Sequence, residues 1–335
     1  FGSSHSCCLT LFRHRFEAMP LKVIRKKPAA SSSPSRSSTN FVKTRPSAVK
    51  TSVLRKPSAA SKAPRGGSGG DTHGSKYESV EALWEAELKD ETSRNKWYAQ
   101  GEKYWKGQDA SIDGVLGGFA QTHGPDIRES KRFIQWVRDR GDLVLPKGSG
   151  SVLDCGAGIG RVTAHLLREQ FGTVDLIEPN RRLLDKAAAD MEGDVKVRNF
   201  KWAPLQDMEV ADEDYDVIWA QWVLLYLPDD DLVNFFKRCQ RMLHPDGLIF
   251  VKENVVKPGG SFVVDREDNS ISRTDGQYKA VFERAGLRVL HEMVQTCWPT
   301  HLIPVRMYAL KPMHARDELS PERTRSMKRP ASSAN

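Results

Sequence analysis

The stretch S-V-L-D-C-G-A-G-I-G-R, residues 151–161, has three glycines at alternate positions directly after a short apolar run. The segment V-T-A-H-L-L-R-E-Q-F that follows has apolar residues at helical spacing. This pattern predicts a buried strand, a tight turn and the start of a helix. Glycines suit such a turn because the backbone bends sharply and a ligand must approach it without a Cβ in the way. The stretch therefore predicts a ligand-binding turn at a helix N-terminus.

Downstream of this turn, apolar runs of strand length alternate with helical segments. We expect strands at 151–154, 173–178, 195–201, 215–221 and 248–253, and a hairpin-like pair at 287–298 and 305–310. The helices expected between them cover 160–170, 181–191, 229–242 and 275–285. This alternation predicts an α/β fold with a doubly wound, mostly parallel, seven-stranded sheet covered by helices on both faces. Ligands of such sheets bind outside the carboxyl ends of the strands.

The two ends of the chain differ in composition from its middle. Residues 1–76 are rich in Ser and Pro and carry 15 Lys or Arg against 2 Asp or Glu, whereas residues 313–335 carry 5 against 3. The whole chain has a net charge of +8, so residues 77–312 have a net charge of −7. We expect both ends to be disordered, and the glycines at 66–70 to form a flexible hinge. The acidic middle should attract a cationic substrate.

The basic arm at residues 1–76 has three interpretations. It is a solvated linker, a nuclear-targeting or weakly nucleic-acid-binding arm around R-K-K at 25–27, or an organelle transit peptide. The chain begins with Phe1, and Met19 is a candidate initiator. Its five cysteines suggest neither a disulfide framework nor a metal site, and no apolar run is long enough to span a membrane. We expect the protein in the nucleus and cytoplasm.

Between the arm and the first strand of the sheet, residues 77–150 predict an N-terminal helical extension. Ser79 is placed as an N-cap before one helical segment, and a second one, N-K-W-Y-A-Q-G-E-K-Y-W, is rich in aromatic residues. Aromatic residues at this spacing belong more often to a core than to a ligand-binding cage. The glycines at 114–118 predict a mobile loop that can close over a ligand as a lid.

Polar residues follow the expected strands at the ligand-binding edge of the sheet. Glu178 ends the second strand, where a carboxylate can accept hydrogen bonds from both ribose hydroxyls of an adenosine group. Leu205 and Gln206 follow the third strand, where an adenine ring would meet an apolar side chain and a polar group. Gln221 and Trp222 end the fourth strand, and their side chains should point to opposite faces. The turn lacks the last glycine of a dinucleotide-binding motif, which disfavours NAD.

Six motifs occur in the same order as in a known enzyme family. They are Y-W-K with D-G-x-L-G-G, L-D-C-G-A-G-I-G-R, L-Q-D, D-V-I-W-x-Q-W-V, K-E-N and D-x-x-D. The set spans residues 103–312 and resembles the protein N-terminal (α-amino) methyltransferases that modify X-Pro-Lys termini. The G-x-G-x-G turn alone is similar to the first motif of class I methyltransferases, which have a Rossmann-like fold. The resemblance implies S-adenosylmethionine (SAM) as the cofactor and protein N-termini as substrates.

The resemblance also assigns roles to individual residues. It implies that SAM is held by Gly156, Arg161, Glu178, Leu205, Gln206 and Gln221, with Arg161 bonded to the methionine carboxylate of SAM. It implies that the peptide is bound by Trp105, Trp222, Asp265 and Asp268, the two aspartates also receiving the ammonium group of a third-position lysine. Asn254 and Asp268 would orient the free α-amino group, which must present a neutral lone pair to the methyl carbon of SAM.

At one position the chain departs from the family pattern. The Q-W-V motif of the family is followed by a histidine proposed to help take the amine proton, and Tyr226 stands at that position here. A neutral tyrosine is a poor base near pH 7 but can form a hydrogen bond with the amine. Deprotonation would then depend on Asp268 or on solvent, so we group Tyr226 with Asn254 and Asp268 as catalytic candidates.

Two other functions fit the sequence less well. The first is a class I methyltransferase that acts on a lysine side chain or a small amine. The second is a module without activity, whose basic arm binds nucleic acid in a salt-dependent way. The D-x-x-D acids also have a plainer interpretation, because acids in a polar loop are often only solvated. The intact glycine turn, Glu178 and Asn254 favour an active N-terminal methyltransferase.

Overall fold

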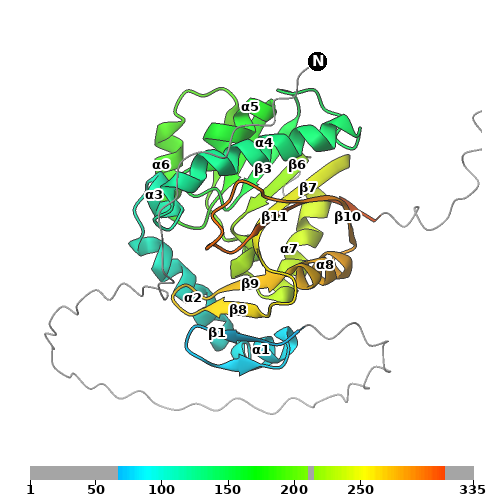
Figure 1. Ribbon diagram of the computed structural model, residues 1–335. Helices are drawn as coiled ribbons and strands as arrows, with labels where there is room; N and C mark the ends of the chain where they lie inside the picture. Colours follow the sequence, from blue (N-terminus) through cyan, green and yellow to red (C-terminus); the bar gives the residue numbers. More distant parts are fainter. Residues whose placement is uncertain (1–66, 210–214, 314–335) are drawn as a thin grey trace, which may run out of the picture. The chain divides into compact units, whose positions relative to one another are not determined.

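The protein is represented by a computed structural model that describes residues 67–209 and 215–313. Its main sheet has the strand order β5-β4-β3-β6-β7-β11-β10. Of these strands, Figure 1 labels β3, β6, β7, β11 and β10. Neighbouring strands are parallel from β5 to β7, whereas β11 is antiparallel to both β7 and β10. The predicted doubly wound, mostly parallel, seven-stranded sheet is therefore confirmed. Its strands are β3 (Ser151–Cys155), β4 (Thr173–Ile177), β5 (Val197–Lys201), β6 (Tyr215–Gln221), β7 (Leu243–Val256), β10 (Leu287–Val294) and β11 (Val305–Pro312).

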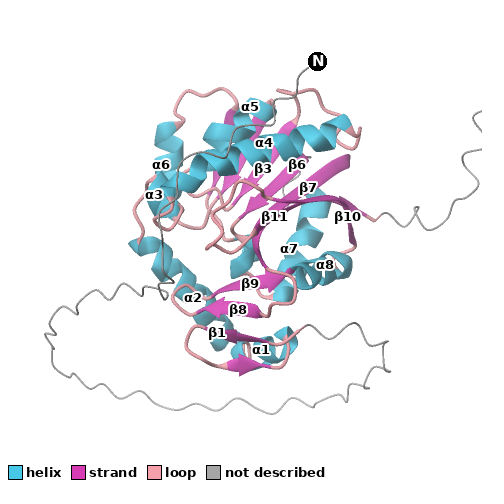
Figure 2. Cartoon of the chain, viewed as in Figure 1, coloured by secondary structure: helices cyan, strands magenta, loops and turns pink. Residues whose placement is uncertain are grey.

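Helices cover both faces of this sheet (Figure 2). In β6, Ile218 and Ala220 point into the cluster formed with α7 and α8, whereas Val217 and Trp219 point into the cluster formed with α4 and α6. This alternation of buried apolar side chains fixes which face each helix covers. The helices are α4 (His123–Asp139), the π-helical segment η2 (Thr163–Leu167), α5 (Arg168–Gln170), α6 (Arg181–Asp190), α7 (Asp229–Met242) and α8 (Asp275–Arg284).

A second, smaller sheet extends from the end of β7 and is absent from the sequence prediction. Its order is β2-β1-β8-β9, and it comprises β1 (Gly69–Asp71), β2 (Lys76–Tyr77), β8 (Phe262–Asp265) and β9 (Ser270–Thr274). The strand predicted at 248–253 is longer than expected, because Val255 and Val256 pair with β9. The segment D-R-E-D-N-S, predicted as a polar loop, is the turn of the antiparallel hairpin β8–β9.

The described part of the chain begins before the predicted end of the disordered arm. Asp71 and the two glycines before it form β1, which pairs in parallel with β8, so the prediction of a disordered segment up to 76 and of a hinge at 66–70 is wrong there. A Cβ on Gly69 would come within 2.4 Å of the Phe262 ring, so a close approach explains this glycine better than flexibility does. The rest of the predicted arm, residues 1–66, and the predicted tail from residue 314 lie outside the described residues.

The predicted N-terminal helices form. They are α1 (Val80–Glu87) and α2 (Glu91–Gly107), and they are followed by two elements that were not predicted, α3 (Ile112–Val115) and the 3-10 turn η1 (Ala120–Thr122). Ser79 caps α1 as predicted, since its hydroxyl accepts a hydrogen bond from the Ala82 amide (3.2 Å). The predicted lid at 114–118 begins within α3, and its closure stays a prediction. In the part of the chain that the structure describes, no helix has the length and apolar character needed to cross a membrane.

The glycine turn adopts a backbone that other residues rarely adopt. Gly156, Gly158 and Gly160 have φ angles of +70°, +57° and +72°. At Gly160, a Cβ would also lie 2.4 Å from the Met191 methyl carbon and 3.2 Å from the Ala187 Cβ. The turn is therefore specified by its left-handed backbone and by the packing of α6 behind it.

Gly160→Ala is expected to lower the free energy of unfolding by about 2–4 kcal/mol, because left-handed strain and overpacking add. Gly193→Ala is the matched control, since Gly193 has φ +78° but no atom within 4 Å of the added Cβ. The control should lose only about 1–2 kcal/mol, from backbone strain. Urea unfolding of both variants measures the difference, and equal losses would contradict the packing explanation.

Candidate functional site

A cavity of about 730 Å³ lies at the carboxyl ends of β3, β4, β5 and β6. Its volume is in the range of small-molecule and cofactor sites. Two candidates from the sequence, Asn254 and Asp265, are not part of its lining. The candidates that line it are Gly156, Arg161, Glu178, Leu205, Gln206 and Gln221, together with Trp105, Trp222, Tyr226 and Asp268.

Glu178 holds the glycine turn in place. Its Oε2 accepts a hydrogen bond from the Gly158 amide (2.9 Å), and its Oε1 accepts one from the Asn180 amide (2.8 Å). Burial raises the pKa of Glu178 to about 7, and the two amide bonds oppose this rise. The cavity thus has a carboxylate at the end of β4, where the sequence predicted a ribose acceptor.

Asp126 is a buried polar centre that the sequence analysis missed. It lies on α4 with 0% exposure, and its carboxylate contacts the Arg161 Nη1 (2.7 Å), the Lys252 Nζ (2.5 Å) and the Gln221 Nε2 (2.9 Å). Burial works to raise the pKa of Asp126, but Lys252 and Arg161 outweigh it and hold the pKa below its usual value. Because these partners lie 35 to 126 residues from Asp126 in the chain, no local sequence pattern predicts that Asp126 is buried and paired.

Asp126 sets the orientation of two predicted cofactor ligands. The amide nitrogen of Gln221 donates to both carboxylate oxygens of Asp126, and its Oε1 accepts from the Trp219 indole (3.2 Å). The Arg161 guanidinium lies 5.5 Å from the Trp222 ring centroid and 3.2 Å from the His123 Nδ1. Gln221 therefore forms a fixed part of the cavity wall.

The L-Q-D segment lies beyond the third strand of the core, as predicted, in the 3-10 turn η3 (Leu205–Asp207). The Arg238 Nη2 donates to the carbonyl oxygens of Leu205 (2.8 Å) and Gln206 (2.9 Å). Nearby, Trp202 is 62% exposed and its indole donates to the Pro179 carbonyl (2.8 Å). At this end, the cavity is thus lined by the apolar Leu205 side chain and by the exposed Trp202 ring.

At the other end of the cavity, Tyr226 and Asp268 form a hydrogen-bonded pair. The Tyr226 hydroxyl donates to the Asp268 Oδ2 (2.9 Å), and the Ser270 amide donates to the Asp268 Oδ1 (3.0 Å). Burial raises the pKa of Asp268 above its usual value, and both hydrogen bonds oppose the rise. Burial and the neighbouring Asp268 also raise the pKa of Tyr226, so Tyr226 is a neutral donor here. The Trp105 ring packs edge-on to Tyr226, with 6.3 Å between centroids.

The Q-W-V turn joins these two ends. Trp222 has φ +53°, which is unusual for a bulky residue, and its indole nitrogen is buried without a partner. The Glu253 Oε1 accepts hydrogen bonds from the Val223 (2.9 Å) and Leu224 (2.8 Å) amides. Burial raises the pKa of Glu253 to about 8. Glu253 belongs to the K-E-N motif, whose asparagine alone was singled out from the sequence.

The two candidates outside the lining have other surroundings. Asn254 was expected at a strand end, but β7 continues past it and Asn254 pairs with Val305 of β11. Asp265 is the exposed last residue of β8, and its Oδ1 accepts a hydrogen bond from the Glu267 amide (2.9 Å). Contact of either side chain with a substrate stays a prediction.

Comparison with known proteins matches this architecture to one enzyme family. The family model described as AdoMet dependent proline di-methyltransferase matches residues 93–311. Alpha N-terminal protein methyltransferase 1 of Dictyostelium discoideum is 44% identical over 73% of this chain and 91% of that protein. N-terminal Xaa-Pro-Lys N-methyltransferase 1 of Danio rerio is 40% identical over 67% and 98%.

A solved structure is also similar over most of the chain. It is a SAM-dependent methyltransferase from Leishmania major, with 40% identity and a TM-score of 0.67 over 76% of this chain and 100% of that one. The resemblance inferred from the six motifs is thus confirmed. This chain belongs to the AdoMet-dependent proline di-methyltransferase family of SAM-dependent methyltransferases.

Proposed function

We propose that this protein transfers methyl groups from SAM to the free α-amino group of protein N-termini of the X-Pro-Lys type. The observation that supports this most directly is that one cavity contains both the Gly156–Glu178 end and the Tyr226–Asp268 end. A methyl donor and an amine can therefore be held side by side. The names of the relatives support this acceptor and not the alternative, a lysine side chain or a small amine.

The residues at the first end of the cavity fit SAM. A Cβ on Gly156 would come within 2.4 Å of Val223, so this position requires glycine, whose backbone carries no side chain toward the cavity. Glu178 offers acceptor oxygens at the end of β4. When bound, SAM supplies an electrophilic methyl group. We assign Gly156, Glu178, Leu205 and Gln206 to direct contacts, Arg161 to the carboxylate of SAM, and Gln221 to the wall that Asp126 fixes.

The residues at the second end fit an ammonium-bearing peptide terminus. An α-amine titrates near pH 8, so its deprotonation at neutral pH costs only about 1 kcal/mol and alignment matters more than a strong base. The Asp268 carboxylate can accept a hydrogen bond from the amine, and Tyr226 holds that carboxylate in place. We assign the peptide channel to Trp105 and Trp222, which line the cavity. We assign Asp265 to the third-position lysine and Asn254 to orientation of the amine.

A proline at the second position suits such a channel. Proline lacks an amide hydrogen and has a fixed φ, so a narrow channel can accept the terminus in one conformation. The net charge of −7 on residues 77–312 favours the approach of a cationic terminus. We also propose that the protein is located in the nucleus and cytoplasm. We propose that its basic arm, which lies outside the described residues, makes weak contact with nucleic acid.

A peptide beginning Ser-Pro-Lys-Arg, incubated with SAM and the full chain, should gain methyl groups on its α-amine. The same peptide with an acetylated α-amine should remain unmodified, because no lone pair is available there. Mass spectrometry of both peptides tests the proposal. Methylation of the acetylated peptide would show that the lysine side chain is the acceptor.

Glu178→Gln and Asp268→Asn should affect opposite ends of the cavity. Loss of the Glu178 carboxylate should weaken SAM binding about tenfold, since hydrogen bonds to a charged group contribute about 1.5–3 kcal/mol. Loss of the Asp268 charge should lower kcat/KM for the peptide about 100-fold and leave the Kd of SAM within about twofold. Calorimetry with SAM and peptide kinetics measure these effects. Equal loss of SAM affinity in both variants would contradict the division of the cavity.

Tyr226→Phe should move the acidic limb of the pH profile of kcat/KM to higher pH. The Tyr226 hydroxyl opposes the rise in the Asp268 pKa that burial causes. Without this hydrogen bond the Asp268 pKa rises further, so the carboxylate becomes protonated at a higher pH and kcat/KM falls earlier as the pH decreases. We expect a shift of about 0.5–1 pH unit. Superimposable profiles would exclude Asp268 as the titrating group.

A further inference from the structure

The hairpin turn between β8 and β9, residues 265–270, contains the acids assigned to the peptide. We call it the substrate turn. Besides the Tyr226–Asp268 hydrogen bond, two contacts tie it to α2: the Gln100 Nε2 donates to the Glu267 carbonyl (2.7 Å), and the Asn269 Nδ2 donates to the Trp97 carbonyl (3.2 Å). These contacts fix the side of the turn that faces the cavity.

The sequence of the substrate turn, D-R-E-D-N-S, contains a single basic residue, Arg266. It follows Asp265 directly and precedes Asp268 by two positions. A guanidinium this close in the chain could pair with either acid and would compete with a cationic peptide for it. The direction of the Arg266 side chain therefore decides how much negative charge the turn presents.

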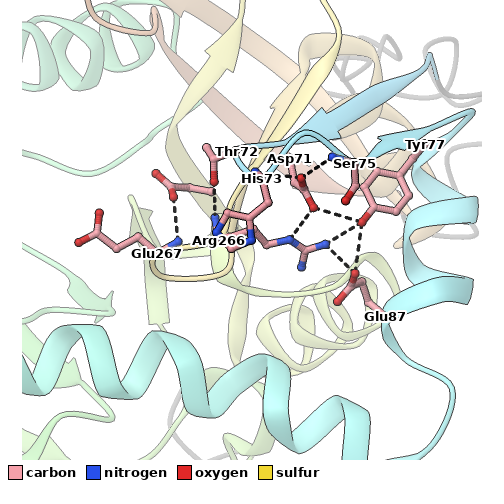
Figure 3. A network of polar contacts seen from close by, with 9 residues as sticks. Asp71, Thr72, His73, Ser75, Tyr77, Glu87, Arg266 and Glu267 are labelled. Carbon is pink, nitrogen blue, oxygen red and sulfur yellow. Dashed lines mark hydrogen bonds and ion pairs between the residues drawn. The ribbon is translucent and has the colours of Figure 1, made fainter. Parts of the chain in front are cut away.

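The Arg266 side chain is held by residues from the N-terminal segment (Figure 3). Its Nε donates to the Asp71 Oδ2 (2.8 Å), and its Nη2 donates to the Glu87 Oε1 (2.6 Å) and to the Tyr77 hydroxyl (2.7 Å). The Arg266 side chain is only 13% exposed. Its charge is thus neutralised by two carboxylates that belong to neither the turn nor the cavity lining.

Backbone contacts hold these carboxylates beside the turn. β1 pairs in parallel with β8, and the Thr72 amide donates to the Val264 carbonyl (3.0 Å). The Arg266 amide in turn donates to the Thr72 hydroxyl (3.0 Å). The Asp71 Oδ1 accepts hydrogen bonds from the His73 (3.0 Å) and Ser75 (2.8 Å) amides, which fixes the orientation of this carboxylate. Residues 71–75 are therefore held in a fixed position beside the substrate turn.

We propose that Asp71 and Glu87 hold Arg266 away from Asp265 and Asp268 and so keep these acids available for a cationic peptide. Asp71, Glu87 and Arg266 are specificity-determining positioning residues that do not touch the substrate. This inference rests on the proposed function of the substrate turn. Asp71 and Glu87 precede residues 93–311, the part that the family model matches.

The test compares three forms of the full chain. Asp71→Asn with Glu87→Gln frees the guanidinium, and the expected result is an increase of about tenfold in KM for the Ser-Pro-Lys-Arg peptide with an unchanged Kd for SAM. Addition of Arg266→Met removes the competing cation, and KM should return to within about threefold of the wild-type value. A peptide with Gln in place of Lys should respond less to the double change.

Asp275→Asn with Glu292→Gln is the matched control. These two carboxylates pair with another arginine, Arg306, at 2.8 and 3.1 Å, and none of the three lines the cavity. The control changes the net charge by the same amount and should leave the peptide KM within about twofold. Thermal unfolding of every variant shows which ones remain folded at the assay temperature.

Three outcomes would overturn the proposal. The first is a triple variant whose KM is no better than that of the double variant, since the network would then act only by supporting the fold. The second is a loss of SAM affinity in the double variant as large as its loss of peptide affinity. The third is an increase in peptide KM in the control variant as large as in the double variant. If the wild-type protein does not methylate the peptide, the proposed function fails instead, and calorimetry of the peptide with S-adenosylhomocysteine present still compares the three forms.

Discussion

The Gly156–Glu178 end of the cavity depends on the buried carboxylate of Asp126. A charge with 0% exposure is tolerated only when it is paired, and Lys252 and Arg161 provide the pairing. Removal of either partner from such a group typically costs about 3–5 kcal/mol. Gln221 is bonded to the same carboxylate, so α4, β6 and the helix after β3 cannot move independently. This constraint keeps Arg161 at the cavity without any contribution from a ligand.

The K-E-N strand connects this constraint to the Tyr226–Asp268 end of the cavity. The Lys252 ammonium contacts Asp126, while its carbonyl accepts a hydrogen bond from the Trp222 amide (3.0 Å). The next residue, Glu253, accepts from the two amides that follow Trp222. Trp222 can keep its unfavourable φ of +53° because hydrogen bonds fix its own amide and the two amides that follow it. Tyr226 follows in the same segment, so adjacent residues of one strand position the walls at both ends of the cavity.

Strand and helix periodicity predicted the main sheet and its ligand-binding edge because both are local properties of the sequence. Glu178, Leu205 and Gln221 could be found for the same reason, since each follows a recognisable strand. Asp126 could not be found from the sequence, because its partners are distant in the chain and an isolated aspartate on a helix resembles any surface acid. The second sheet was missed because its strands are two to five residues long and pair with segments far away, such as β1 with β8.

Under the proposed function, the tyrosine at position 226 changes which group can accept the amine proton. A histidine in its place would be able to take a proton, whereas this hydroxyl remains neutral and donates to Asp268. Under the proposed function, the acceptor role falls to the Asp268 carboxylate, whose pKa burial raises above its usual value. Since deprotonation of an α-amine costs only about 1 kcal/mol near pH 7, the reaction needs an oriented acceptor more than a strong base. The acceptor that we propose is Asp268, which Tyr226 orients and which lies in a turn whose own arginine is bonded to Asp71 and Glu87.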